Sequence, residues 1–186
     1  MHPLNNNYDL ARRDSRGGGA RPGQGLEWDR RHMRLADLLS TEAVIPALKA
    51  NNKKQALQEL SDKAAEICGL PAREIFDALL QRERLGSTGI GDGVAIPHGK
   101  LARIKSIFGI FARLERPIDF EALDGAPVDL IFLLITPEAS GADHLKALAC
   151  AARVLRDPGI VATIRATRDP SALYSIIAQT STPHAA

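Results

Sequence analysis

Residues 85–100 read LGSTGIGDGVAIPHGK and are the most informative part of the chain. A glycine-dense turn leads into a short apolar segment that ends on one histidine, His98. The histidine side chain is a usable nucleophile near neutral pH, because its ordinary pKa lies near ~6.5. Pro97 stiffens the approach to this histidine, and Gly99 has no side chain that would obstruct a partner. The stretch therefore predicts an imidazole that is accessible to another molecule.

The glycines of this stretch have other interpretations. Asp92-Gly93 is a favourable hairpin pair, so the glycines alone predict a tight β-turn. A phosphate loop does not fit, because residues 93–100 contain one residue too many and Leu101 follows where Ser or Thr is required. The dinucleotide-binding spacing is also absent, since glycine simply alternates with other residues over 89–93.

Composition limits the class of protein. The chain has 186 residues, of which 45% are hydrophobic, which is enough for the core of one domain. No apolar run approaches the ~20 residues of a membrane span, and no signal peptide is recognisable, so a cytoplasmic location is expected. The net charge of +2 arises in residues 1–32, and the charge-balanced remainder argues against a nucleic-acid-binding protein. Cys68 and Cys150 lie in helical apolar patterns and are expected to be buried without a disulfide.

The pattern of residues predicts an α/β domain over residues 33–180. Residues 1–32 show no period and are expected to be a disordered extension, and residues 181–186 are expected to be a C-terminal tail. Apolar runs predict strands over 106–114 and 128–136, the second of them central in the sheet. Helices are expected over 34–39, 53–68, from Pro71 to Gly86, and over 142–156, 158–166 and 170–179. Residues 40–48 are interpreted as a connection or a short strand, and the strand order is left open.

Several segments together resemble a known phosphorylation-site signature. These are Arg82-Glu83, residues 87–99 (STGIGDGVAIPHG) and residues 143–145 (DHL). The signature is that of enzyme IIA proteins of the phosphotransferase system, in the fructose/mannitol/nitrogen-regulatory superfamily. The resemblance extends from about residue 33 to residue 179. Residues 35–39 (LADLL) and 53–57 (KKQAL) look most like the nitrogen-regulatory branch.

This resemblance implies a fold and a function. The fold is a single domain in which helices flank a mixed β-sheet. The function is that of a phosphohistidine carrier, in which His98 accepts a phosphoryl group on Nε2 from a small phosphocarrier protein of the HPr/NPr kind. The carrier then regulates partner proteins of nitrogen, potassium or carbon metabolism through its phosphorylation state. Because the phosphoryl group passes between proteins without a nucleotide, no metal and no other cofactor is implied.

The resemblance also implies roles for residues around His98. By position, His144 is the family's second active-site histidine and is expected to stabilise the transferred phosphoryl group. Arg82 is expected to contact the phosphoryl oxygens through its bidentate guanidinium. The phosphoryl-binding loop is expected to comprise Ser87, Thr88, Gly89 and Gly91.

Each of these residues also has a simpler interpretation. His98 could be an ordinary loop histidine. His144 could be a surface residue at the start of a helix, with Ser140 and Asp143 as a capping pair. Arg82 could be a solvated helix cation.

Three other functions remain as alternatives. The first is a sugar-specific enzyme IIA that passes the phosphoryl group to a IIB protein of a fructose- or mannitol-type transporter. The second is a protein-binding module that is not phosphorylated. The third is a metal-dependent hydrolase that uses His98 and His144, which is disfavoured because no cluster with metal-ligand spacing accompanies them.

Overall fold

A computed structural model describes residues 33–180. The segments 1–32 and 181–186, expected to be an extension and a tail, lie outside the described residues. The helices are α1 (Leu35–Leu38), α2 (Lys53–Cys68), α3 (Ala72–Arg84), α4 (Ala142–Leu155), α5 (Pro158–Ala166) and α6 (Pro170–Gln179), with short 3-10 turns at Thr41–Ala43 and Glu138–Ser140. The strands are β1 (Val44–Leu48), β2 (Gly89–Gly91), β3 (Val94–Ala95), β4 (His98–Leu101), β5 (Phe108–Ile118) and β6 (Val128–Pro137).

The strands form one mixed sheet in the order β1-β5-β6-β3-β2. Strand β4 also pairs with β6, further along the same side as β3. Strand β5 runs antiparallel to β6, whereas β3 and β4 run parallel to it. The expected mixed sheet and the central position of β6 are therefore confirmed, and residues 130–136 of β6 are all buried.

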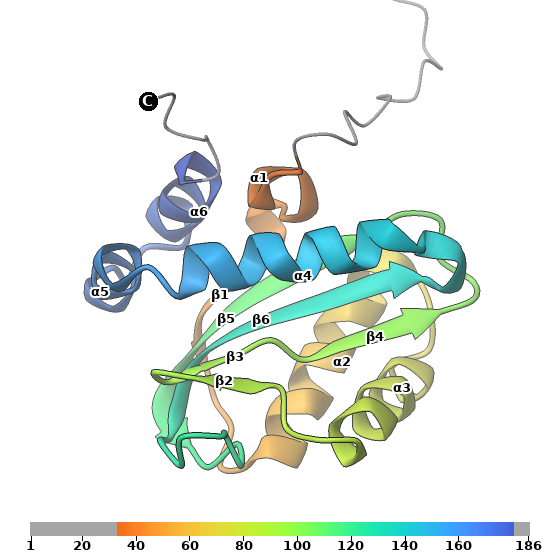
Figure 1. Cartoon of the computed structure of the whole chain (residues 1–186), viewed down its shortest axis with the longest axis horizontal. Helices are drawn as coiled ribbons and strands as arrows, with labels where there is room; N and C mark the ends of the chain where they lie inside the picture. The colour runs from red at the N-terminus through yellow and green to blue at the C-terminus, as the bar shows by residue number, and fades with distance from the viewer. Residues whose placement is uncertain (1–32, 181–186) are drawn as a thin grey trace, which may run out of the picture.

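Helices cover both faces of this sheet. Figure 1 shows α4 along one side of the sheet, with α2 and α3 on the opposite side. Helices α1, α5 and α6 gather next to α4. Three buried phenylalanines, Phe111, Phe120 and Phe132, are among the largest side chains of the core between these layers. Burial of large apolar side chains on both faces is the main stabilising contribution to such a fold.

The helix boundaries follow local sequence signals. Helix α2 begins after Asn52, whose side chain accepts a hydrogen bond from the Gln55 N–H, and it ends at Gly69 with φ +75°. Helices α5 and α6 each begin with a proline after an aspartate cap, Asp157 or Asp169. The expected ranges 53–68, 158–166 and 170–179 are confirmed. The segment 40–48 contains both a turn and strand β1.

The glycine-dense stretch forms a hairpin. Strands β2 and β3 are antiparallel and are joined at Asp92-Gly93, so the tight turn predicted from these residues is confirmed. A Cβ atom at Gly89 would lie 2.7 Å from the Cβ of Ala122, which explains the lack of a side chain there. The Arg165 guanidinium donates to the Asp92 carbonyl at 2.7 Å and thereby holds the hairpin against α5.

The two cysteines are free, as expected, with Cys150 buried and Cys68 partly buried. Within residues 33–180, no helix is long and apolar enough to cross a membrane.

Candidate phosphohistidine site

His98 is the first residue of strand β4. It pairs with Leu134 of β6 and follows a break at Ile96-Pro97 that separates β3 from β4. Pro97 has no N–H, so it suits the point where the pairing along β6 is interrupted. Interpretation of His98 as an ordinary loop histidine is therefore wrong, because its backbone belongs to the sheet and its side chain is half-buried.

Strand alternation determines which way each residue of β4 faces. A Cβ atom at Gly99 would lie 3.5 Å from Leu79 of α3, so Gly99 faces α3. His98 and Lys100 therefore face α4. The expectation that Gly99 lets a partner approach is corrected, because this buried glycine lets α3 pack closely against the strand.

Hydrogen bonds distinguish the two ring nitrogens of His98. Nδ1 lies 2.9 Å from the Ile96 carbonyl oxygen, which can only accept, so the proton is on Nδ1. The Arg82 Nε–H donates to Nε2 at 3.0 Å, which requires a lone pair there. The two contacts agree on one tautomer, in which Nε2 carries the lone pair.

Arg82 reaches His98 from the opposite face of the sheet. It lies in the last turn of α3, and among the described residues β4 pairs with β6 alone. Its Nη1 donates to the Gly86 carbonyl at 3.0 Å. The interpretation of Arg82 as a solvated cation is wrong, because the guanidinium joins the glycine loop to the histidine.

His144 lies in the first turn of α4 and faces His98. The two ring centroids are 5.4 Å apart, and the His144 residue is only 8% exposed. Its Nδ1 lies 2.9 Å from the Thr136 hydroxyl of β6. The interpretation as a surface residue at a helix start is therefore wrong.

The capping pair expected beside His144 is also absent. The N-cap of α4 is Gly141, with no side-chain cap hydrogen bond. Asp143 forms an ion pair with Lys146 at 3.8 Å, and the Ser140 hydroxyl oxygen is buried without a hydrogen-bond partner. The N–H groups of the first turn of α4 are consequently not capped by Ser140.

Both histidines are poised to be neutral. Burial lowers the pKa of His98; the bond to Ile96 opposes this effect, and the positive charge of Arg82 adds to it. Burial also lowers the pKa of His144, followed by the charges of His98, Lys100 and Arg82. A neutral imidazole is the form that has a nucleophilic lone pair.

The residues of the predicted phosphoryl-binding loop have partners within the protein. Ser87 Oγ donates to the Phe120 carbonyl at 2.8 Å and accepts from the Gly89 N–H. Thr88 is buried, and its hydroxyl donates to Glu83. Gly91 pairs with Val94 beside the hairpin turn and lies seven residues before His98 along the chain.

Two residues near the histidines were not singled out from the sequence. Lys100 is exposed on the same face as His98, and strand alternation from His98 could have revealed it. Thr136 is buried, and nothing in the sequence marks it as a partner of His144. Within residues 33–180, no group of three or more His, Cys, Asp and Glu side chains is arranged to hold a metal ion.

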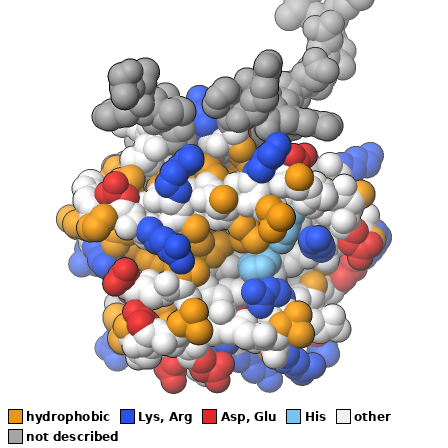
Figure 2. Space-filling model, in the orientation of Figure 1, with side chains coloured by type: hydrophobic (Ala, Val, Ile, Leu, Met, Phe, Trp, Pro, Cys, Tyr) orange, Lys and Arg blue, Asp and Glu red, His pale blue; other side chains and the backbone are white. Residues whose placement is uncertain are grey.

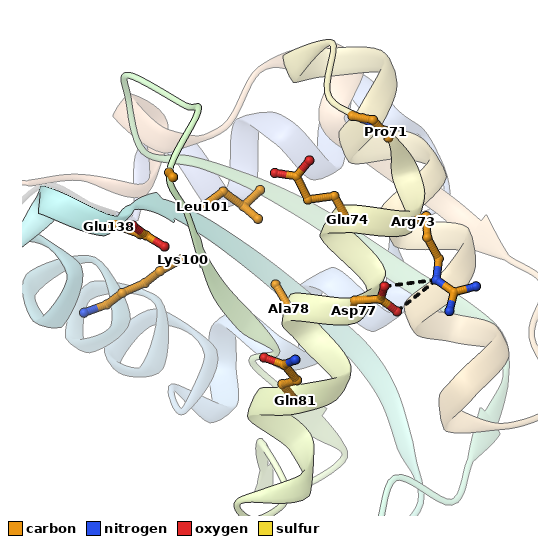
Figure 3. A pocket seen from close by; sticks show the side chains of 10 residues that line it. Pro71, Arg73, Glu74, Asp77, Ala78, Gln81, Lys100, Leu101 and Glu138 are labelled. Atoms are coloured by element: carbon orange, nitrogen blue, oxygen red, sulfur yellow. Dashed lines mark hydrogen bonds and ion pairs between the residues drawn. The ribbon is translucent and has the colours of Figure 1, made fainter.

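Part of the histidine pair is accessible from outside, although His98 is half-buried and His144 is buried. Figure 2 shows the pale-blue histidine side chains together, bordered by hydrophobic and by Lys or Arg side chains. Leu145, next to His144, is 67% exposed. An open groove of about 570 Å³ runs beside the site between α3 and β4 and includes the Arg73–Asp77 ion pair (Figure 3). Neither histidine lines this groove.

Comparison with known proteins agrees with this geometry. Residues 37–180 match the family described as phosphoenolpyruvate-dependent sugar phosphotransferase system, EIIA 2. The chain belongs to this family. It is 62% identical over 146 residues to a nitrogen regulatory protein of Bradyrhizobium diazoefficiens, a match that covers 78% of this chain and 95% of the relative.

Solved structures of EIIA proteins support the same assignment. The nitrogen regulatory protein IIA-Ntr from Neisseria meningitidis matches with a TM-score of 0.74 and 32% identity, covering 77% of this chain and 98% of that one. IIA mannitol from Escherichia coli matches with a TM-score of 0.65 and 20% identity, covering 75% of this chain and 99% of that one, which shows a shared fold. The expected EIIA family, its fold and the likeness to the nitrogen-regulatory branch are thus confirmed.

Proposed function

We propose that this EIIA protein is a phosphohistidine carrier, and that Nε2 of His98 accepts a phosphoryl group from a phosphocarrier protein of the HPr/NPr kind. The observation that carries the proposal is the hydrogen bond from His98 Nδ1 to the Ile96 carbonyl. This bond places the proton on Nδ1 and leaves the Nε2 lone pair for attack. Arg82 and His144, on two different elements, lie beside that atom or its ring.

The transfer step is an in-line displacement. The Nε2 lone pair of His98 forms a bond to phosphorus, and the bond between phosphorus and the leaving atom of the donor breaks, with its electron pair going to that atom. In the resting site Arg82 donates to Nε2, so the guanidinium must shift from the nitrogen to the phosphoryl oxygens. Its charge then offsets the negative charge of those oxygens.

His144 is well placed to donate a second hydrogen bond. Its Nδ1 is 2.9 Å from the Thr136 hydroxyl, whereas that hydroxyl is 3.5 Å from the Gly99 carbonyl. We assign the hydroxyl proton to the shorter contact, which leaves the proton of the neutral ring on Nε2 of His144. If His144 gains a proton beside the phosphoryl group, the hydroxyl can instead turn to Gly99 and accept from Nδ1. The Thr136 hydroxyl can therefore form a hydrogen bond with both the neutral and the protonated ring of His144.

The glycine loop acts on the site indirectly. The hydroxyls of Ser87 and Thr88 would have to leave Phe120 and Glu83 to contact the phosphoryl oxygens directly. We therefore assign Ser87, Thr88, Gly89 and Gly91 to shaping the loop that holds Arg82 through the Gly86 carbonyl. The oxygen contacts then come from Arg82 and His144.

The regulatory output follows from charge. A phosphoryl group adds about −1.5 to −2 units of charge to the surface around His98. Partner proteins of nitrogen, potassium or carbon metabolism would then bind one state and not the other, and we place this exchange in the cytoplasm. A sugar-specific IIA that passes the group to a IIB protein is the second candidate, and the 62% identity to a nitrogen regulatory protein favours the regulatory role.

Phosphoryl uptake can be tested directly. Incubation with a phosphorylated HPr/NPr-like protein should add the mass of one phosphoryl group. Peptide mapping should place it on His98, and the bond should be labile in acid and stable in base, as a P–N bond is. Protein that stays unmodified with an active donor would instead support the module that binds partners without phosphorylation. Addition of a IIB protein to the phosphorylated chain separates the regulatory role from the sugar-specific one.

The rate of uptake should depend on pH through His98. Burial and the charge of Arg82 hold the pKa of His98 below its ordinary value, so the acid limb of the rate profile should have a midpoint below about 6.5. The same shift affects folding: as the pH falls through about 6.5 the unfolded chain binds the proton first, so the free energy of unfolding decreases. NMR titration of His98 with parallel rate measurements tests this, and a midpoint at or above 6.5 contradicts it.

A further inference from the structure

Glu83 is a buried carboxylate next to Arg82 in the last turn of α3. It is 7% exposed, and it is the only acidic side chain among residues 33–180 that is buried. Its Oε2 lies 2.7 Å from the Lys53 Nζ at the start of α2, on the helix adjacent to α3 (Figure 1). A buried ion pair adds little to stability on its own, because desolvation of both charges offsets their attraction. The role of Glu83 is therefore indicated by its contacts beyond the ion pair.

Lys53 is firmly held in its charged form. Burial alone would lower the pKa of Lys53, but the bonds to Glu83 and Glu121 outweigh burial and raise it. The ammonium also lies 5.1 Å from the centre of the Phe120 ring. Lys53 thus supplies a fixed cation that keeps the Glu83 carboxylate in place.

The other side of the Glu83 carboxylate holds the glycine loop. The Thr88 hydroxyl donates to Oε1, and the Thr88 N–H donates to Oε2 at 3.3 Å. Both donors of this residue are therefore bound by one carboxylate, which fixes the orientation of the Thr88 peptide groups.

Thr88 in turn fixes the segment before His98. Its carbonyl accepts the Ile96 N–H at 2.9 Å, and the Ile96 carbonyl lies 2.9 Å from Nδ1 of His98. A free neutral imidazole can place its proton on either nitrogen. The Ile96 carbonyl selects Nδ1, and its position depends on Thr88 and therefore on Glu83.

We propose that Glu83 is a positioning residue: through Thr88 and Ile96 it holds His98 in the Nδ1-protonated tautomer, with Nε2 free to react. The catalytic consequence rests on the proposed phosphoryl transfer, whereas the tautomer does not. Arg82 donates a hydrogen bond to the Gly86 carbonyl, which lies in the loop between Glu83 and Thr88. The Glu83 carboxylate therefore orients a loop on which both Arg82 and His98 depend.

The test uses matched variants of the full chain. Glu83→Gln keeps the shape of the side chain but removes its charge. Thr88→Val removes the hydroxyl, and Thr88→Ser retains it. Glu121→Gln is the control. Glu121 is an exposed partner of the same lysine, whereas the bonds to Thr88 come from the Glu83 carboxylate. The readouts are the ¹⁵N shifts of the His98 ring, which report the tautomer, and the transfer rate from a phosphorylated HPr/NPr-like donor.

Glu83→Gln and Thr88→Val should increase the Nε2-protonated fraction of His98 and slow transfer by ~10-fold, the order of loss expected when a hydrogen bond that orients a functional histidine is removed. Thr88→Ser and Glu121→Gln should resemble the unaltered protein in both readouts. A folded Glu83→Gln protein with unchanged ring shifts would overturn the proposal. If that variant does not fold, identical shifts in Thr88→Val and Thr88→Ser overturn it. The ring shifts are measured without a phosphoryl donor. They therefore test the role of Glu83 even if the protein does not accept a phosphoryl group.

Discussion

Replacement of His98 by alanine is expected to abolish phosphoryl uptake and leave the domain folded. The alanine variant has no nucleophile at this position, and we propose His144, whose ring faces His98 and contacts the Thr136 hydroxyl, as a hydrogen-bond donor to the phosphoryl group and not as its acceptor. The half-buried ring of His98 makes two hydrogen bonds, to Ile96 and with Arg82, so its loss should cost about 1–3 kcal/mol of stability. The label from a phosphorylated donor and the thermal unfolding of the variant measure the two effects.

A glutamine at position 98 is the matched control. His98→Gln keeps a polar group near the Ile96 carbonyl and the Arg82 guanidinium, and it should be more stable than the alanine variant. It should remain equally unlabelled, because an amide is not a nucleophile at neutral pH. Full labelling of either variant would show that the phosphoryl group resides on another side chain.

Replacement of His144 by alanine is expected to slow uptake without moving the acceptor. Removal of one donor from a site where charge develops typically slows the reaction by ~10²–10³-fold. The phosphoryl group should still map to His98. His144→Gln should retain more activity than His144→Ala, because the amide can still donate a hydrogen bond.

Rapid-quench rates at a saturating concentration of donor protein distinguish hydrogen-bond donation by His144 from a contribution of His144 to binding of the donor protein. A loss confined to the rate at saturation indicates a donor to the reacting group, whereas a loss that extra donor protein overcomes indicates a docking contact. Unimpaired rates for both variants would remove His144 from the reaction. Thermal unfolding of both proteins is the control, since the ring is buried and contacts Thr136.

Much of this fold can be predicted locally. The ends of α2, α5 and α6 are set by side chains and glycines within a few residues of each boundary, so their ranges can be read from the sequence. The apolar run of β6 likewise indicates a strand buried on both faces. The Asp92-Gly93 pair indicates the hairpin for the same reason, because turn conformation is a local property.

The site itself depends on contacts that no local rule gives. The pairing of β4 with β6 places His98 in the sheet, and that pairing joins segments more than thirty residues apart. Arg82 reaches His98 only because α3 packs against β4. The resemblance to EIIA proteins supplied the identity of these residues, but the burial of His144 and the tautomer of His98 required the structure.

Strands β3 and β4 both pair with β6, so the number of residues that connect them determines which way the side chains of β4 face. Val94 and Ala95 pair with β6, and pairing resumes at His98 after Ile96-Pro97. Successive residues of a strand face opposite sides, so gain or loss of a single residue in this connection would exchange odd and even positions throughout β4. The imidazole would then point at α3, away from α4. The connection at Ile96-Pro97 should therefore tolerate substitution of its residues far better than insertion or deletion of a single residue.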